Sequence, residues 1–104
     1  MMSKWLDKSD PEINKAVAKT RNLNWNVSAV DSDVIMIDCC EVFDPCNVVN
    51  DSWPIIIENN ISIFSVALDS GIWQAEHYCH NGVKDKNPLR AAMIAYLEMK
   101  GVQP

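Results

Sequence analysis

The stretch D-P-C-N-V-V-N-D-S-W-P-I-I-I-E-N-N-I-S-I, residues 44–63, combines a polar segment, a tryptophan and two apolar runs. Pro45 and Pro54 each favour extended backbone in the residue before them. The Asn, Asp and Ser side chains between the two prolines favour turns, because they hydrogen-bond to nearby backbone. We therefore expect residues 44–53 to form an irregular loop rather than a helix, followed by a short apolar segment at Ile55–Ile57.

Upstream of this stretch, the sequence predicts one helix and then strands. Ser9 and Glu12 form a capping box, and Pro11 suits the first turn of a helix. The core-facing stripe of this helix is expected at positions 13, 16, 17 and 20, which recur with helical spacing. Residues 23–30 alternate weakly, and residues 34–37 are a β-branched run, so both segments are candidate strands, with the second continuing towards Val42.

Downstream, the sequence predicts a hairpin and a closing helix. Residues 61–66 and 72–78 read as two strands joined by a turn at Asp69–Gly71, which indicates an antiparallel pair. Residues 81–86 are expected to form a charged loop. Asn87 as cap, Pro88 at the first position and Gly101 at the stop then delimit a helix.

These elements predict a single domain spanning residues 1–104 and an α+β fold. We expect a small, mainly antiparallel sheet, with an N-terminal helix and a C-terminal helix packed on one face.

The net charge of −5 disfavours general nucleic-acid binding, because an acidic surface repels the phosphate backbone. No apolar run approaches the roughly 20 residues that span a bilayer. The N-terminal residues lack the apolar core and cleavage site of a secretory signal. We therefore expect a cytoplasmic protein with no membrane contact, in which the cysteines are reduced.

Metal-binding and catalytic patterns are weak. The cysteines at 39, 40, 46 and 79 and the histidines at 77 and 80 do not have the paired spacing of a zinc site. Cys79 lies between the two histidines, but the chain has no nucleophile elbow, phosphate-binding loop or dinucleotide fingerprint. We expect no metal, no cofactor and no enzymatic activity. The pairs Asp31/Asp33 and Asp44/Asp51 are typical of turn caps.

A pocket for an anion or a nucleotide is the most specific hypothesis that the residues support. Arg90 falls in the first turn of the closing helix, where the helix dipole and free N–H groups favour negative charge. Trp53 and Trp73 offer stacking surfaces, and polar side chains before Trp53 could read polar edges. The predicted ligand-binding residues are Asp44, Asn47, Asp51, Trp53, Trp73 and Arg90. The alternative also stays open: the tryptophans belong to the core and Arg90 pairs with a nearby acid.

Several segments resemble the NinX-like family of small bacteriophage proteins. They are E-I-N-K-A-V-A at 12–18, D-P-C-N at 44–47, D-S-W-P-I-I at 51–56, E-N at 58–59, I-S at 61–62 and N-P-L-R-A-A-M-I at 87–94. Residues 48–50 are more apolar than expected for that family, and residues 22–40 carry no resemblance. The resemblance implies a phage or prophage gene product that acts in an infected bacterium, but it implies no established activity.

Three classes of function remain open. The first, which we predict, is a non-enzymatic binding protein that sequesters a small anionic ligand, a nucleotide-type signal, and so counters host defence. The second is an acidic inhibitor that binds a host defence or regulatory protein. The third is an enzyme that uses Cys79 with His77, or an Asp cluster. We expect the protein to act in the cytoplasm of the infected host as a homo-oligomer, because ligand pockets of so small a domain often form between subunits.

Overall fold

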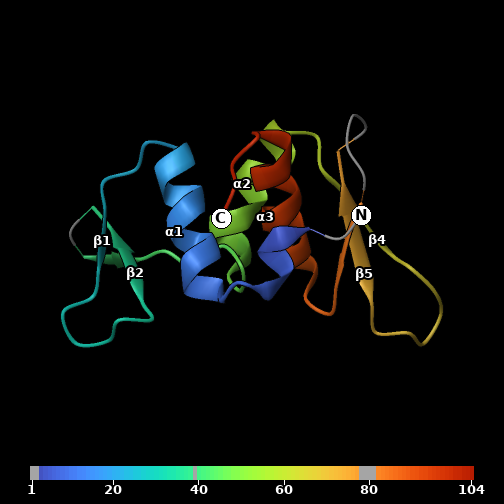
Figure 1. The fold of residues 1–104 in the computed structure, drawn as a ribbon, viewed down its shortest axis with the longest axis horizontal. Helices are drawn as coiled ribbons and strands as arrows, with labels where there is room; N and C mark the ends of the chain where they lie inside the picture. The colour runs from blue at the N-terminus through green and yellow to red at the C-terminus, as the bar shows by residue number, and fades with distance from the viewer. Residues whose placement is uncertain (1–2, 39, 78–81) are drawn as a thin grey trace.

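The computed structural model describes residues 3–38, 40–77 and 82–104, and it places a small sheet at each end of a helical middle (Figure 1). Helix α3 (Pro88–Met99) is the centre of this arrangement. It packs against α1 (Asp10–Thr20), α2 (Val49–Glu58) and the sheet formed within residues 62–85. All side chains from Ala91 to Leu97 are buried, so α3 is covered on every side.

Helices α1 and α3 begin where capping chemistry predicts. The Ser9 hydroxyl accepts a hydrogen bond from the Glu12 N–H at 3.3 Å, which starts α1. The Asn87 side-chain oxygen accepts from the Leu89 N–H at 2.9 Å, which starts α3. Gly101 has a φ of +74°, a left-handed conformation that ends α3 without strain. Both predicted helices are confirmed.

A short 3-10 helix, η1 (Lys4–Asp7), precedes α1. Its Trp5 side chain is buried, and the indole N–H donates to the Val102 carbonyl at 2.9 Å. This bond fastens the chain after α3 to the chain before α1. Figure 1 accordingly shows the C-terminus between α1 and α3.

The first sheet lies outside α1 and has the strand order β1-β2-β3, with both pairs antiparallel. Its strands are β1 (Trp25–Val27), β2 (Ile35–Ile37) and β3 (Glu41–Val42). The prediction of one strand continuing from residue 34 towards Val42 is wrong. Asp38 adopts a positive φ of +50°, which turns the chain and makes β3 a separate strand.

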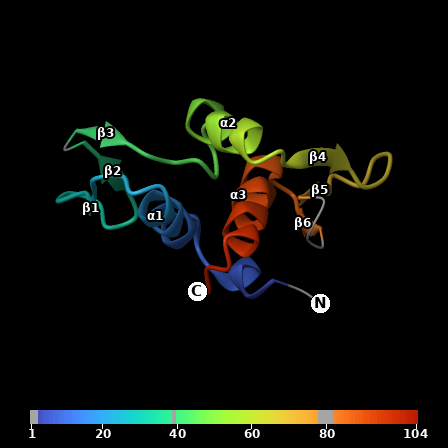
Figure 2. The same cartoon turned by 90° about the horizontal axis from the view of Figure 1, so that it is seen from above.

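The second sheet lies on the other side of α3 and has the order β4-β5-β6 (Figure 2). Its strands are β4 (Ser62–Ser65), β5 (Trp73–Glu76) and β6 (Val83–Asp85). The predicted hairpin is confirmed, with Ile63 opposite Ala75. The prediction of a loop at 81–86 is wrong, because buried Val83 pairs with Ala75 and makes β6 part of the sheet.

The expected irregular loop over residues 44–53 is wrong for its second half, because α2 begins at Val49. Pro54 lies inside this helix, at a cost of about 3 kcal/mol in an ordinary helix interior. Ile55 and Ile56 are buried in the core, and each contributes about 1.5–3 kcal/mol by leaving water. Packing against α3 therefore outweighs the local preference of Pro54. Within the described ranges, no helix has the length and apolar character needed to cross a membrane.

Candidate functional site

A polar network joins the loop at residues 44–47 to the starts of α1 and α3. Asn14 is its buried member: its side-chain N–H₂ donates to Asp44 Oδ1 at 2.8 Å, and its Oδ1 accepts from the Cys46 N–H at 3.1 Å. The Asp44 N–H in turn donates to Asp51 Oδ2 at 3.0 Å. These bonds hold the loop closed on itself and against α1.

Asn47 uses both ends of its side-chain amide in the same network. Its N–H₂ donates to Asp10 Oδ2 at 2.9 Å and to Asp44 Oδ1 at 3.1 Å. Its Oδ1 accepts from the Asn87 amide at 3.0 Å. The predicted residues Asp44, Asn47 and Asp51 therefore do lie together, but their polar atoms bind the protein itself.

The Arg90 side chain interacts with carboxylates and backbone carbonyls of neighbouring elements. Its guanidinium forms an ion pair with Asp10 at 2.6 Å, donates to the Lys8 carbonyl at 2.7 Å and to the Leu6 carbonyl at 3.1 Å, and lies 3.6 Å from Asp85. The side chain is only 13% exposed. The alternative in which Arg90 pairs with a nearby acid is confirmed. Its charge is already balanced by two carboxylates.

The two predicted stacking residues lie on different elements. Trp53 is on α2 with 52% of its surface exposed, and Trp73 is on β5 with 38% exposed. The interpretation of both as core aromatics is therefore wrong. Trp73 is opposite Asp85 in the second sheet, at the edge of the polar network. Neither tryptophan lines the cleft beside Asp44 and Asn47, so the six predicted residues do not form one pocket.

The cleft beside Asp44 and Asn47 has a volume of about 170 Å³. Asp10, Asp33 and Asp44 contribute three carboxylates to its lining, together with apolar side chains such as Phe43. This charge disfavours an anionic ligand. In the part of the chain that the structure describes, no group of three His, Cys, Asp or Glu side chains is arranged to hold a metal ion.

A larger groove lies between α1, η1 and the residues that follow α3. We call it the lysine groove, and its volume is about 310 Å³. It is lined by Trp5, Lys8, Glu12, Lys15, Ala16, Lys19, Thr20, Val102, Gln103 and Pro104. The Lys15 and Lys19 ammonium groups lie 5.1 Å and 5.4 Å from the centre of the Trp25 ring, within cation–π range.

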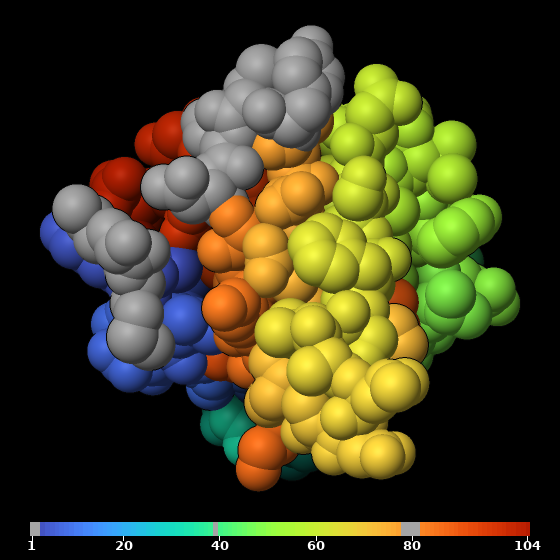
Figure 3. Space-filling view, turned by 90° about the vertical axis from the view of Figure 1, so that its right-hand side faces the viewer, coloured from blue at the N-terminus to red at the C-terminus, as the bar shows by residue number. Residues whose placement is uncertain are grey.

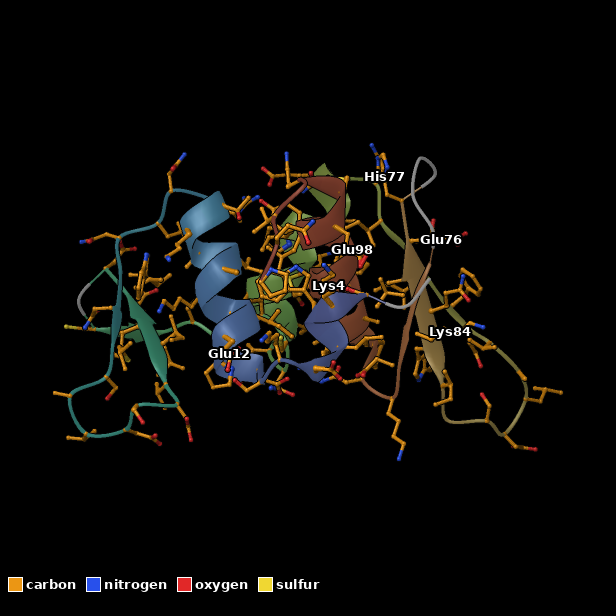
Figure 4. All side chains as sticks on the ribbon, viewed as in Figure 1. Lys4, Glu12, Glu76, His77, Lys84 and Glu98 are labelled. Atoms are coloured by element: carbon orange, nitrogen blue, oxygen red, sulfur yellow. The ribbon has the colours of Figure 1, made fainter. Side chains whose placement is uncertain are left out.

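Within the described residues, the lysines of this groove form no ion pair. The ion pairs between described residues involve Arg21 and Arg90, and none involves Lys8, Lys15 or Lys19. Glu12 is the acidic side chain of the lining. Figure 4 shows Glu12 at the beginning of α1, whereas Lys84 lies on the second sheet, on the other side of α3.

The distribution of charge along the chain is strongly uneven. All 9 Lys and Arg residues lie within residues 4–21 and 84–100. The intervening residues 22–83 contain 9 of the 14 acidic residues and no Lys or Arg. This signal was available in the sequence and identifies both a cationic region and an acidic one. The spacing of four between Lys15 and Lys19 also indicates one helix face.

The Cys46 thiol and the Asp31/Asp33 pair have structural environments that do not favour catalysis. Burial, and secondarily Asp10, raise the pKa of the Cys46 thiol, so it stays protonated and is a poor nucleophile. Cys39, Cys79 and His80 lie outside the described residues. The Asp31 carboxylate accepts from the Asp33 N–H at 2.9 Å, which confirms the predicted turn cap at this pair.

A family model described as bacteriophage P22 NinX matches residues 5–100. No curated protein matches the chain, and no solved structure matches it. The matched span includes the buried Trp5, both sheets and all of α1, α2 and α3. It also includes the polar network and the three lysines of the groove. The chain therefore belongs to the family of bacteriophage P22 NinX.

Proposed function

We propose that this phage-family protein is a non-enzymatic accessory protein that sequesters a small anionic ligand in the lysine groove. The ligand class is a phosphate-bearing, nucleotide-type signal, and its removal would counter host defence in the cytoplasm of the infected bacterium. The observation that carries the proposal is a groove with three lysines, none of which is ion-paired with another described residue, in a chain of net charge −5.

The size and lining of the groove suit such a ligand. Its volume of about 310 Å³ is at the lower end of the range of small-molecule sites, which is roughly 300–1,000 Å³. Lys8, Lys15 and Lys19 provide ammonium groups that bind phosphate as point charges. A bound anion would also relieve the mutual repulsion of the three cations.

The predicted set Asp44, Asn47, Asp51, Trp53, Trp73 and Arg90 is less suited to an anion. Asp10 and Asp85 already balance the charge of Arg90, and the neighbouring cleft contains three carboxylates. We therefore assign the ligand to the lysine groove rather than to that set.

Native mass spectrometry of the protein purified from phage-challenged cells tests the capture of a ligand. We expect an additional mass of several hundred daltons, retained unchanged, and the same spectrum reports whether the protein is the homo-oligomer that we propose. The matched pair of variants is Lys15→Gln/Lys19→Gln, which removes two groove cations, and Lys84→Gln/Lys86→Gln, which removes two exposed cations elsewhere.

Only the groove variant should lose the bound mass. In titrations with AMP and with inorganic phosphate, the groove variant should likewise bind more weakly than the Lys84→Gln/Lys86→Gln variant. A spectrum without ligand, together with no binding of either probe, would overturn capture. If Trp53→Ala removes the mass and the groove variant retains it, the ligand binds at Trp53 instead.

A second candidate function is inhibition of a host protein by surface contact. The observation that favours it is the acidic segment 22–83, which contains no Lys or Arg and carries exposed apolar side chains on α2.

A further inference from the structure

Helix α2 carries apolar side chains on two faces. One face, with Ile55 and Ile56, is buried against the core. On the other, Val49, Trp53 and Ile57 are 53%, 52% and 57% exposed. Their spacing of four places them in one row along the helix, of the kind that packs between the ridges of a partner helix. We call these three residues the α2 ridge.

The start of α2 carries a further exposed apolar residue, at the expense of helix stability. Val48 occupies the N-cap position, no side chain caps the helix there, and Val48 is itself exposed. A valine at this position costs about 0.5–2 kcal/mol relative to Ser, Asn or Asp. Asp51, a possible capping partner, instead accepts from the Asp44 N–H. The apolar residue therefore serves something other than the stability of α2.

The second sheet continues the apolar surface beyond α2. Phe64 on β4, the element after α2, and Val66, which directly follows β4, are both exposed. Figure 3 shows atoms of α2 and of the β4–β5 hairpin side by side on one face of the molecule. Scattered apolar residues are ordinary on a surface, but a row of this kind with a central tryptophan is typical of an interaction site.

Charge decides which partner fits the ridge. α2 carries Asp51 and Glu58 and no cation, and Glu58 is paired with Arg21 of the chain after α1. The hairpin segment up to residue 76 adds Asp69 and Glu76 and again no Lys or Arg. A second copy would bring the same acidic surroundings to the contact, and like charges there would repel. A partner with Lys or Arg beside its apolar residues has the complementary charge.

We propose that the α2 ridge binds an amphipathic basic helix of a partner protein. The inference rests on the second candidate function, inhibition of a host protein, and names the surface and the partner class for it. Trp53 inserts between the apolar side chains of the partner helix, and Asp51 with the neighbouring acids attracts its cations.

Amide and indole NMR spectra of the labelled protein test the inference with two designed helical peptides. Both peptides have a leucine face; the other face carries lysine in one peptide and glutamate in the second. We expect only the lysine peptide to bind, with shifts confined to the Trp53 indole and to residues 48–58 and 62–66. Added salt should weaken the binding. Trp53→Ser should weaken it at least tenfold, as for a central hot-spot residue.

The matched control is Val30→Ser, which removes an apolar side chain that is 95% exposed outside the ridge and should leave the affinity unchanged. Ile57→Lys is a second variant, and it should weaken binding through both shape and charge. Equal binding of the glutamate peptide, or of the Trp53→Ser protein, would overturn the proposal. Concentration-dependent dimerisation that Trp53→Ser abolishes would identify a second copy as the occupant and would also overturn it.

The same titration separates this inference from the function on which it rests. If the lysine peptide binds but the shifts lie in the first sheet, the ridge is not the docking surface and the inhibitor function stands. If neither peptide binds, the proposed partner class is wrong and the inference fails, whereas the inhibitor function fails only if no host protein binds the chain at all.

Discussion

The side chains of Asn47 and Asn87, forty residues apart, share a hydrogen bond of 3.0 Å in which the Asn87 amide donates to Asn47 Oδ1. The same Asn87 amide donates to the Cys46 carbonyl at 2.7 Å, and its oxygen accepts from the Leu89 and Arg90 N–H groups. One residue therefore caps the central helix and fastens the loop before α2 to it. The polar residues of this loop support the fold, which explains why they are not free for a ligand.

Replacing Asn87 should destabilise the protein through both of its roles. We expect Asn87→Ala to lower the free energy of unfolding by about 2–4 kcal/mol, because it removes a helix cap and leaves the Cys46 carbonyl without its donor. Asn87→Asp keeps the capping oxygen but places a carboxylate oxygen, which cannot donate, against the Cys46 carbonyl and Asn47 Oδ1, so it should not restore the lost stability. Urea denaturation measures both, with Asn26→Ala, an exposed asparagine, as the control. A loss as small as that of the control would show that the network does not stabilise the fold.

Arg90 should contribute to the stability of the fold. Arg90→Lys keeps the positive charge but cannot serve Asp10 and the Leu6 and Lys8 carbonyls together, since lysine lacks the planar fork of arginine. We expect a decrease of roughly 1–3 kcal/mol in the free energy of unfolding, as for a buried charged hydrogen bond that is lost. Thermal melts followed by circular dichroism test this. If Arg90→Lys melts like the unchanged protein but fails to retain the captured ligand, Arg90 is a ligand residue after all.

Local chemistry explains which helices could be predicted. The capping box at Ser9–Glu12 and the interval from Asn87 to Gly101 are signals contained within one element, and both helices form where those signals lie. Helix α2 has the opposite character, because its sequence contains Pro54 and an apolar cap, and its stability comes from Ile55 and Ile56 against α3. Such packing depends on residues far away in the sequence.

The same distinction applies to the candidate sites. The position of Arg90 in the first turn of α3 was predictable, but its partner Asp10 is 80 residues away. The lysine groove brings α1 together with Val102 and its neighbours, which no local pattern indicates. The unbroken absence of Lys and Arg from residues 22–83 was the available signal, and it bears on both proposed surfaces.

A better N-cap should stabilise α2. We expect Val48→Asn to raise the free energy of unfolding by about 1 kcal/mol, because asparagine caps a helix and valine does not. Val49→Asn, one residue further on, should give no such gain, since it lies inside the helix. Urea denaturation of the two variants compares them directly. If Val48→Asn is no more stable than the unchanged protein, the missing side-chain cap at residue 48 does not lower the stability of α2.

The stability of the protein should fall as the pH rises above 9.0, the ordinary value for a thiol, because Cys46 resists ionisation in the fold. Burial raises the pKa of Cys46, so only the unfolded chain releases this proton above pH 9.0. The stabilisation is complete below that pH, and each further unit removes up to about 1.4 kcal/mol. Urea denaturation at a series of alkaline pH values measures the fall. Cys46→Ala should abolish it below pH 10.0, where Tyr96, whose pKa burial also raises, begins to contribute. Equal slopes in the Cys46→Ala variant and the unchanged protein would contradict the role of Cys46.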